Sequence, residues 1–316
     1  MDGTSWENGR SLSGATAGGQ TEARLWLLAL AALVVLIVAP FFLVDVPPVL
    51  DYPNHLARLY VLAFGADDPA LSAMYAPHWS IVPNLAIDLV GPPLMHLLPV
   101  SVVGRVLLAL AALIPVAGVI LYHRAVFGVR SWWPLASGVI AFNGILFFGF
   151  MNYLYAVGLA FMLAAYWIAL RARHPLVAVA GSAAGVVVLF FCHIAGPLLF
   201  ALLAGLHEVV LLWRAWRGRQ SLRQRLLRLA GLFLALLPAV ALFVSSALAE
   251  TKAPLEWEPP MDKLVQLFTP LASYDPRITL LSAMVAVAVL IYVQFRRPRI
   301  DAATALAFLV IAAAYV

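Results

Sequence analysis

Apolar runs of about 20 residues recur along this chain, and they limit its possible folds more than any other feature. A helix needs roughly 20 such residues to cross a membrane. The mean hydropathy of +0.96 and a charged fraction of only 11% exclude an ordinary soluble domain. The sequence therefore predicts an all-α, polytopic transmembrane helical bundle of about eight or nine spans. We place them at residues 25–44, 102–122, 134–148, 150–170, 176–192, 197–213, 229–248 and 278–295, with a ninth beginning near residue 304.

The two ends of the chain differ in composition. Residues 1–22 are rich in Gly, Ser and Thr, so we expect a disordered cytoplasmic tail, followed by one multi-span membrane domain over residues 23–316. The first apolar run is too long for a cleavable signal peptide. The chain stops inside an apolar run at Val316, so we expect a longer protein. A single cysteine, Cys192, excludes a disulfide framework.

The distribution of positive charge predicts the orientation in the membrane. A pI near 9.6 is compatible with nucleic-acid binding, but the basic residues lie in short loops between spans, where they set topology. We therefore expect no nucleic-acid partner, and we expect a prokaryotic inner (plasma) membrane with the N-terminus in the cytoplasm. In that orientation only five of the 20 basic residues fall outside: Arg58, Arg105, Lys252, Lys263 and Arg277.

The first outside loop, residues 45–101, opens with a polar cluster directly after the first span. Apolar residues recur at helical spacing from Leu56 to Ala63, whereas Asp51, His55 and Arg58 fall on the opposite face. This pattern predicts a short amphipathic juxtamembrane helix on the membrane surface, with Asp51 as its N-cap.

Each residue of this cluster has a functional and a structural interpretation. Asp51 can act as a general base, or it can only cap the helix. His55 lies one turn below and can orient the Asp51 carboxylate, bind a metal with it, donate to a substrate phosphate, or do none of these as a surface histidine. Arg58 is a candidate ligand for a substrate phosphate, or it can extend to lipid headgroups.

Polar residues at the outer ends of later spans are further candidates. Asn152 follows Gly144 and Gly149, two glycines that permit a tight turn, and His193 ends the fifth span. The topology predicts that Asn152 and His193 converge with Asp51 on one cavity, where they can bind substrate or serve structural roles. Asp88 lies in an apolar stretch, so we expect it to face a cavity or pair with a cation such as Arg105.

The second large outside loop, residues 249–277, mixes acidic residues, prolines and two lysines. Lys252 and Lys263 are candidate ligands for a substrate phosphate, although proline-rich loops are often only connectors. We assign no metal ligands and no cofactor. The sequence is compatible with a divalent metal but does not support one.

The stretch Asp51-Tyr-Pro-Asn-His-Leu-Ala-Arg58 resembles a run in the GT-C superfamily of integral-membrane glycosyltransferases. In its mannosyl- and aminoarabinosyl-transferase branches, an acid opens a run of the type Asp-Glu-x-x-Tyr-x-x-x-Ala-Arg, on a long outside loop after an N-in first span. Here Tyr52 replaces the second acid and the spacing to Ala57-Arg58 is shorter. The resemblance implies a polyprenyl-phosphate-linked sugar donor, membrane lipids around the site, and Asp51 as general base. The acceptor can be a glycan, a lipid or a protein.

Two other classes of function are open. A transporter or channel needs ionisable residues along its spans, and spans three to seven carry almost none apart from His207 and Glu208 near one end. A non-catalytic subunit for assembly or export of an envelope polymer is the third reading.

The charge asymmetry predicts which positions a membrane-impermeant thiol reagent reaches in whole cells. On a Cys192→Ala background, we expect an Asp51→Cys protein to be labelled and an Arg219→Cys protein to be protected. Labelling at 219 with protection at 51 would reverse the topology and place Asp51 in the cytoplasm.

Overall fold

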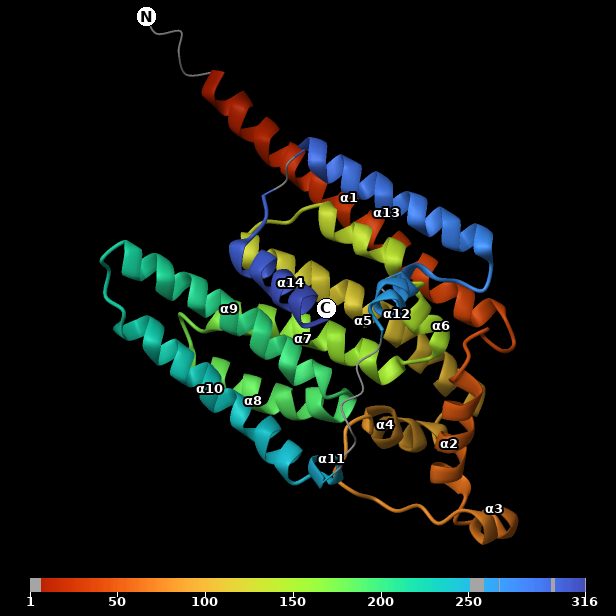
Figure 1. Cartoon of the computed structure of the whole chain (residues 1–316). Coiled ribbons are helices and arrows are strands. Elements are labelled where there is room, and N and C mark those ends of the chain that lie inside the picture. Colours follow the sequence, from red (N-terminus) through yellow and green to blue (C-terminus); the bar gives the residue numbers. More distant parts are fainter. Residues whose placement is uncertain (1–6, 251–258, 267, 297–298, 316) are drawn as a thin grey trace, which may run out of the picture.

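The computed structural model describes residues 7–250, 259–266, 268–296 and 299–315, and these residues form helices, turns and loops without a strand (Figure 1). The long helices are α1 (Glu7–Leu43), α5 (Val100–Phe127), α7 (Met151–Leu170), α8 (Pro175–Cys192), α9 (Ala195–Arg217), α10 (Arg223–Val244) and α13 (Pro276–Arg296). The short ones are α2 (Tyr52–Phe64), α3 (Pro69–Met74), α4 (Ala86–Met95), α6 (Gly144–Phe148), α11 (Ala247–Glu250), α12 (Pro260–Gln266) and α14 (Ala302–Tyr315), with 3-10 helices η1 (Trp133–Ile140) and η2 (Thr269–Leu271).

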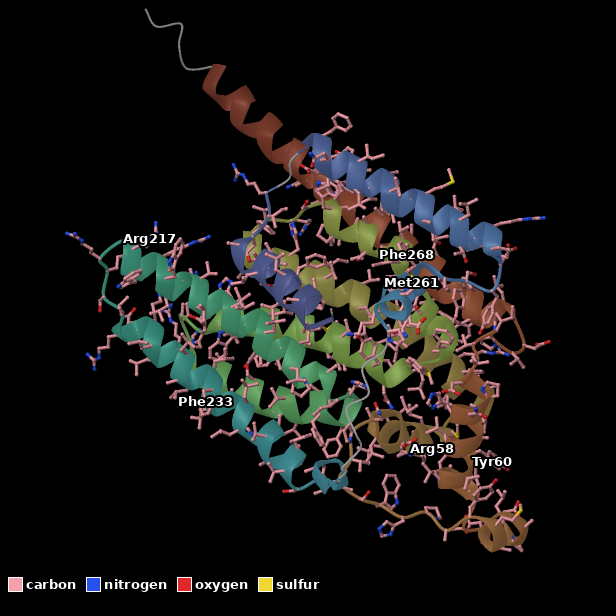
Figure 2. All side chains as sticks on the ribbon, in the orientation of Figure 1. Arg58, Tyr60, Arg217, Phe233, Met261 and Phe268 are labelled. Carbon is pink, nitrogen blue, oxygen red and sulfur yellow. The ribbon has the colours of Figure 1, made fainter. Side chains whose placement is uncertain are left out.

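Seven of the described helices are long and apolar enough to cross a membrane, α1 being counted from Gly19. They correspond to seven of the eight complete spans expected from the sequence, which confirms an all-helical membrane protein. Most of them lie side by side, with Arg217 at one end of the bundle and Arg58 at the other (Figure 2).

The exception is the expected span at residues 134–148, which is not one continuous helix. Its first part is the 3-10 helix η1, and Asn143 then caps the short helix α6 by accepting a hydrogen bond from the Leu146 amide. Gly138 lets this segment approach α1 closely, since a Cβ there would lie 2.5 Å from Leu33. The segment nevertheless follows α1 along its length, from the Trp26–Ser131 hydrogen bond at one end to the stacked rings of Phe41 and Phe142 near the other.

The N-terminal region also differs from the expectation. Residues 7–22, expected to be a disordered tail, form the first turns of α1, and residues 1–6 lie outside the described part of the chain. Extending an existing helix costs far less than nucleating a new one, so the apolar part of α1 can support these turns.

Helices α5 and α7 form the centre of the molecule and contribute to both hydrophobic clusters of the core. Their backbones meet at two glycines: a Cβ on Gly118 would lie 2.4 Å from the Gly158 carbonyl oxygen, and one on Gly158 would lie 2.5 Å from Ile114 and Pro115. Small residues allow this close approach between membrane helices. On one side of α5 and α7 lie α1, α2 and α4, and on the other lie α8, α9, α10 and α14.

The elements that position the polar cluster gather at the end of the bundle marked by Arg58 in Figure 2. Helix α2 forms as expected, with Pro53 in its first turn and Leu59 buried against α4 and the core. Helix α4 stays short, because Pro92 and Pro93 remove backbone donors from its second half.

The contact between Gly118 and Gly158 predicts a sharp position dependence. We expect Gly158→Ala to lower stability in detergent by about 1–3 kcal/mol, because the new methyl group must push two backbones apart. Gly205→Ala in α9 is the matched control, since a Cβ there meets nothing within 4 Å. Thermal unfolding of both variants measures the difference; equal melting temperatures would contradict the close packing of α5 on α7.

Candidate functional site

A polar cavity of about 550 Å³ lies between α2, α4 and the start of α7. Asp51, Asn152 and His193 line it together, with His55, Arg58 and Asp88 of the other residues singled out from the sequence. The lining residues are Asp51, His55, Arg58, Asn84, Ile87, Asp88, Ile145, Phe150, Met151, Asn152, Tyr153 and His193.

The turn at residues 147–149 holds the start of α2 against the bundle. The amides of Leu50 and Asp51 donate to the carbonyl oxygens of Phe147 and Phe148, at 2.8 and 3.2 Å. Gly149 has a φ of +90°, and a Cβ there would lie 2.8 Å from the Asp51 Cβ. Both facts favour glycine at 149, because another residue would be strained and would displace Asp51.

The side chain of Asp51 is not a helix cap, which corrects one expectation. It stands at the N-cap position of α2, but its carboxylate makes no hydrogen bond to the helix amides. Instead Oδ1 accepts a hydrogen bond of 3.1 Å from the Asn54 side chain. The half-buried carboxylate therefore lines the cavity without serving the helix end.

His55 also has a different partner from the one expected. Its Nε2 lies 3.1 Å from the Gly149 carbonyl oxygen, so the imidazole donates to the turn and does not contact the Asp51 carboxylate. This bond joins the first turn of α2 to the same glycine that approaches Asp51. His55 thus helps to fix the position of Asp51 from the other side.

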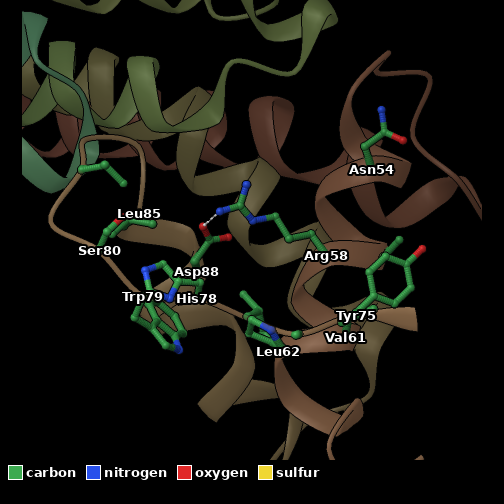
Figure 3. A pocket seen from close by; sticks show the side chains of 14 residues that line it. Asn54, Arg58, Val61, Leu62, Tyr75, His78, Trp79, Ser80, Leu85 and Asp88 are labelled. Atoms are coloured by element: carbon green, nitrogen blue, oxygen red, sulfur yellow. Dashed lines mark ion pairs between the residues drawn. The ribbon is translucent and has the colours of Figure 1, made fainter. Parts of the chain in front are cut away.

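Arg58 forms an ion pair with Asp88, 2.6 Å from Nη2 to Oδ2, as Figure 3 shows. Asp88 thus faces a cavity and pairs with a cation, as expected, but the cation is Arg58: Arg105 instead donates to the Asp45 carbonyl oxygen at 2.9 Å. The physical reason is that α4 packs on α2, which turns Asp88 toward Arg58. The Asp88 side chain is 2% exposed and that of Arg58 is 59% exposed, so one partner is buried and the other reaches solvent.

Burial raises the pKa of Asp88, while the positive charges of Arg58 and His55 oppose that rise. The Arg58 guanidinium therefore favours a carboxylate that burial would otherwise tend to protonate.

A second cavity, of about 450 Å³, lies on the other side of the ion pair (Figure 3). Arg58 and Asp88 line both cavities, and the loop after α3 supplies the ring side chains of Tyr75, His78 and Trp79 to the second one. The sequence pattern does not predict this cavity, because one of its walls is an irregular loop without periodicity.

Asn152 positions α4. Its Nδ2 donates to the Asn84 carbonyl oxygen at 2.7 Å and its Oδ1 accepts from the Ile87 amide at 3.2 Å. Asn84 has a φ of +67°, a conformation that asparagine tolerates better than most residues. The buried Asn152 amide therefore holds the turn before α4, and with it the turn that carries Asp88.

His193 joins α8 to α9. Its Nδ1 accepts a hydrogen bond of 3.1 Å from the Ala195 amide, and its ring meets the edge of Tyr153 at 5.2 Å between centroids. Burial lowers the pKa of His193, which favours the neutral imidazole. A neutral ring that accepts at Nδ1 carries its proton on Nε2, so it can donate one hydrogen bond.

Of the two lysines expected in the loop at residues 249–277, the structure describes only Lys263. Lys263 is on α12 and is not among the residues that line the cavity, and Lys252 lies outside the described residues. Within the described part of the chain, no group of three His, Cys, Asp or Glu side chains is placed to hold a metal ion.

No protein-family model matches this chain, and neither the curated proteins nor the solved structures give a match. The function is therefore inferred from the residues of the site and their geometry.

The ion pair predicts a pH-dependent loss of stability in Arg58→Gln. Without the guanidinium the pKa of Asp88 rises further, so folding opposes ionisation of a buried carboxylate. We expect a loss of about 1–3 kcal/mol at neutral pH, which shrinks as the pH falls and Asp88 becomes protonated in the folded state.

Combining Arg58→Gln with Asp88→Asn is the control, because the double variant has no carboxyl group at position 88 to ionise. Its melting temperature at neutral pH should exceed that of Arg58→Gln alone. A loss in Arg58→Gln that does not change with pH would mean that Asp88 is not its cause.

Proposed function

We propose that this protein is a membrane glycosyltransferase that moves a sugar from a polyprenyl-phosphate donor to an acceptor on the outer face of the membrane. The observation that carries the proposal is the cavity in which the Asp51 carboxylate meets polar groups from α2, α4, α7 and the α8–α9 turn. The resemblance of residues 51–58 to the acidic run of GT-C enzymes adds the donor class. The acceptor can be a glycan, a lipid or a protein.

The reaction needs two things from the protein. An acceptor hydroxyl must lose its proton as it attacks the anomeric carbon, and the negative charge of the departing polyprenyl phosphate must be stabilised. Asp51 is the general base in this proposal, since one of its oxygens accepts from Asn54 and the carboxylate lines the cavity.

Arg58 is the group that stabilises the leaving phosphate. Its side chain is more than half exposed although it pairs with Asp88, so the guanidinium can hold Asp88 with one nitrogen and a phosphate with others. His193 can add a neutral donor, and Lys252 and Lys263 stay as candidate phosphate ligands from the second outside loop. This scheme requires no metal, and it is also compatible with a bound divalent metal.

The proposal includes the finer topology: an N-terminus in the cytoplasm of a prokaryotic cell, and crossings by residues 134–148 and by α14 in addition to the seven long helices. Support for the first crossing comes from the contacts that this segment makes with α1 from Trp26 to Phe41. An apolar cavity of about 360 Å³ between α1 and α5 opens beside the same segment.

The substitution Asp51→Asn separates catalysis from structure. Asparagine keeps the size of the side chain and the oxygen that accepts from Asn54, but it cannot take a proton at neutral pH. We expect normal insertion and an unchanged melting temperature, with transfer from a polyprenyl-phosphate sugar reduced roughly 100-fold or more in isolated membranes.

Asp67→Asn is the matched control, because Asp67 belongs to the same loop, is exposed, and lines neither cavity. It should retain full activity. Near-native turnover by Asp51→Asn would remove Asp51 from the mechanism. No transfer by the wild-type protein from any lipid-linked sugar would favour a transporter, or a non-catalytic subunit of envelope-polymer assembly.

A further inference from the structure

A separate pocket lies at the end of the bundle opposite to Asp51, where α7 turns into α8 and α10 begins. Its volume is about 310 Å³, and the residues that line it are Trp167, Arg171, Ala172, Pro175, Val179, Gln224, Leu227, Arg228 and Gly231. None of them lines the cavity around Asp51. The pocket is therefore separate from the proposed catalytic site.

Arg171 is the most constrained group in this pocket. Its side chain is only 10% exposed and forms an ion pair with the fully buried Glu208, 2.8 Å from Nη1 to Oε1. Nη2 contacts His207 Nε2 at 3.0 Å, and Glu208 also accepts from the Trp167 indole at 3.1 Å. The Nε–H of Arg171 has no hydrogen-bond partner among the described residues, and a buried donor of this kind is costly to leave unpaired.

The charge around Arg171 is positive even after the ion pair is counted. Burial lowers the pKa of Arg171 and Glu208 opposes this, while the charges of Arg228 and Arg225 lower it further. Two of these arginines, Arg171 and Arg228, line the pocket itself. A negative charge bound here would relieve the repulsion between the arginines.

The remaining walls of the pocket are apolar. The indole of Trp167 and the side chain of Val179 form one wall, and Gly231 packs against them, since a Cβ there would lie 3.1 Å from Val179. Leu227, at the rim, is 62% exposed, as expected for a side chain that faces lipid. Polar groups at one end and apolar groups along the side suit an amphiphile.

We propose that this pocket binds the phosphodiester headgroup of an anionic phospholipid, with Arg171 and Arg228 on the phosphate and the acyl chains against Leu227. Guanidinium groups bind phosphate through charge-assisted hydrogen bonds. Basic pockets between helices at a membrane surface are suited to acidic lipids. The site is independent of the proposed transferase chemistry.

Native mass spectrometry of the purified full chain, with phosphatidylglycerol or phosphatidylcholine added, tests the proposal. We expect the wild-type protein to retain phosphatidylglycerol in preference to phosphatidylcholine, and phosphatidylglycerol to raise its melting temperature. Arg228→Gln should weaken this binding roughly tenfold or more, the loss of one charge-assisted contact. Ala172→Glu, at an exposed position on the rim, should weaken it as well.

Arg223→Gln is the matched control: it removes the same charge from the same helix at an exposed position that does not line the pocket. It should bind phosphatidylglycerol as the wild type does. Arg171 itself is left unchanged, because its removal would strand the buried Glu208. Equal retention of both lipids, or equal effects of Arg223→Gln and Arg228→Gln, would overturn the proposal. So would displacement of the lipid by millimolar inorganic phosphate, which would identify a site for the free ion.

Discussion

The two backbone hydrogen bonds from residues 50 and 51 to the carbonyls of Phe147 and Phe148 are the constraint on which the candidate site depends. They join the loop after α1 to the turn before α7, almost 100 residues later in the chain. Because Gly149 carries no side chain, the two backbones come close enough for these bonds to form. The backbone consequently holds Asp51 in place, and the carboxylate oxygens make no hydrogen bond to the amides at the helix end.

A second set of contacts holds the facing wall of the cavity. Asn152, in the first turn of α7, fixes the turn that leads into α4, and α4 in turn carries Asp88 to Arg58. The turn before α7 therefore positions the base candidate, and the first turn of α7 positions the cation candidate. Met151 and Leu154 of that first turn are buried in the hydrophobic cluster that α7 shares with α5.

Much of the architecture could be predicted from the sequence, because a membrane span is a long, local signal. In a multi-span protein, alternate loops lie on the same side of the membrane. Topology alone therefore predicts that Asp51, Asn152 and His193 converge. The choice between Arg58 and Arg105 as partner of Asp88 could not be made in this way, since α4 packs on both α2 and α5 and only its tertiary position decides which helix Asp88 faces. The break within residues 134–148 escaped prediction because hydropathy measures apolar length and does not register that a 3-10 helix ends at Ile140 or that Asn143 begins a new helix.

The contacts of His55 and Asp51 show a similar limit. Helical spacing places His55 and Asn54 near Asp51 equally well, and only the tertiary position of Gly149 decides that the imidazole turns away while the amide turns in. The loop that supplies Trp79 to the second cavity has no periodic signal at all, so its contribution depends on where α3 and α4 place its two ends.

The position of the Arg58–Asp88 pair between two cavities has a thermodynamic consequence. Any anion that draws the guanidinium away from Asp88 weakens the interaction that keeps this buried carboxylate ionised, and the proton affinity of Asp88 must then rise. Linkage is reciprocal, so protonation of Asp88 must equally strengthen the binding of that anion. Anion binding at Arg58 is thus coupled to proton uptake at a group that need not touch the ligand, and both cavities share in this coupling because both border the pair.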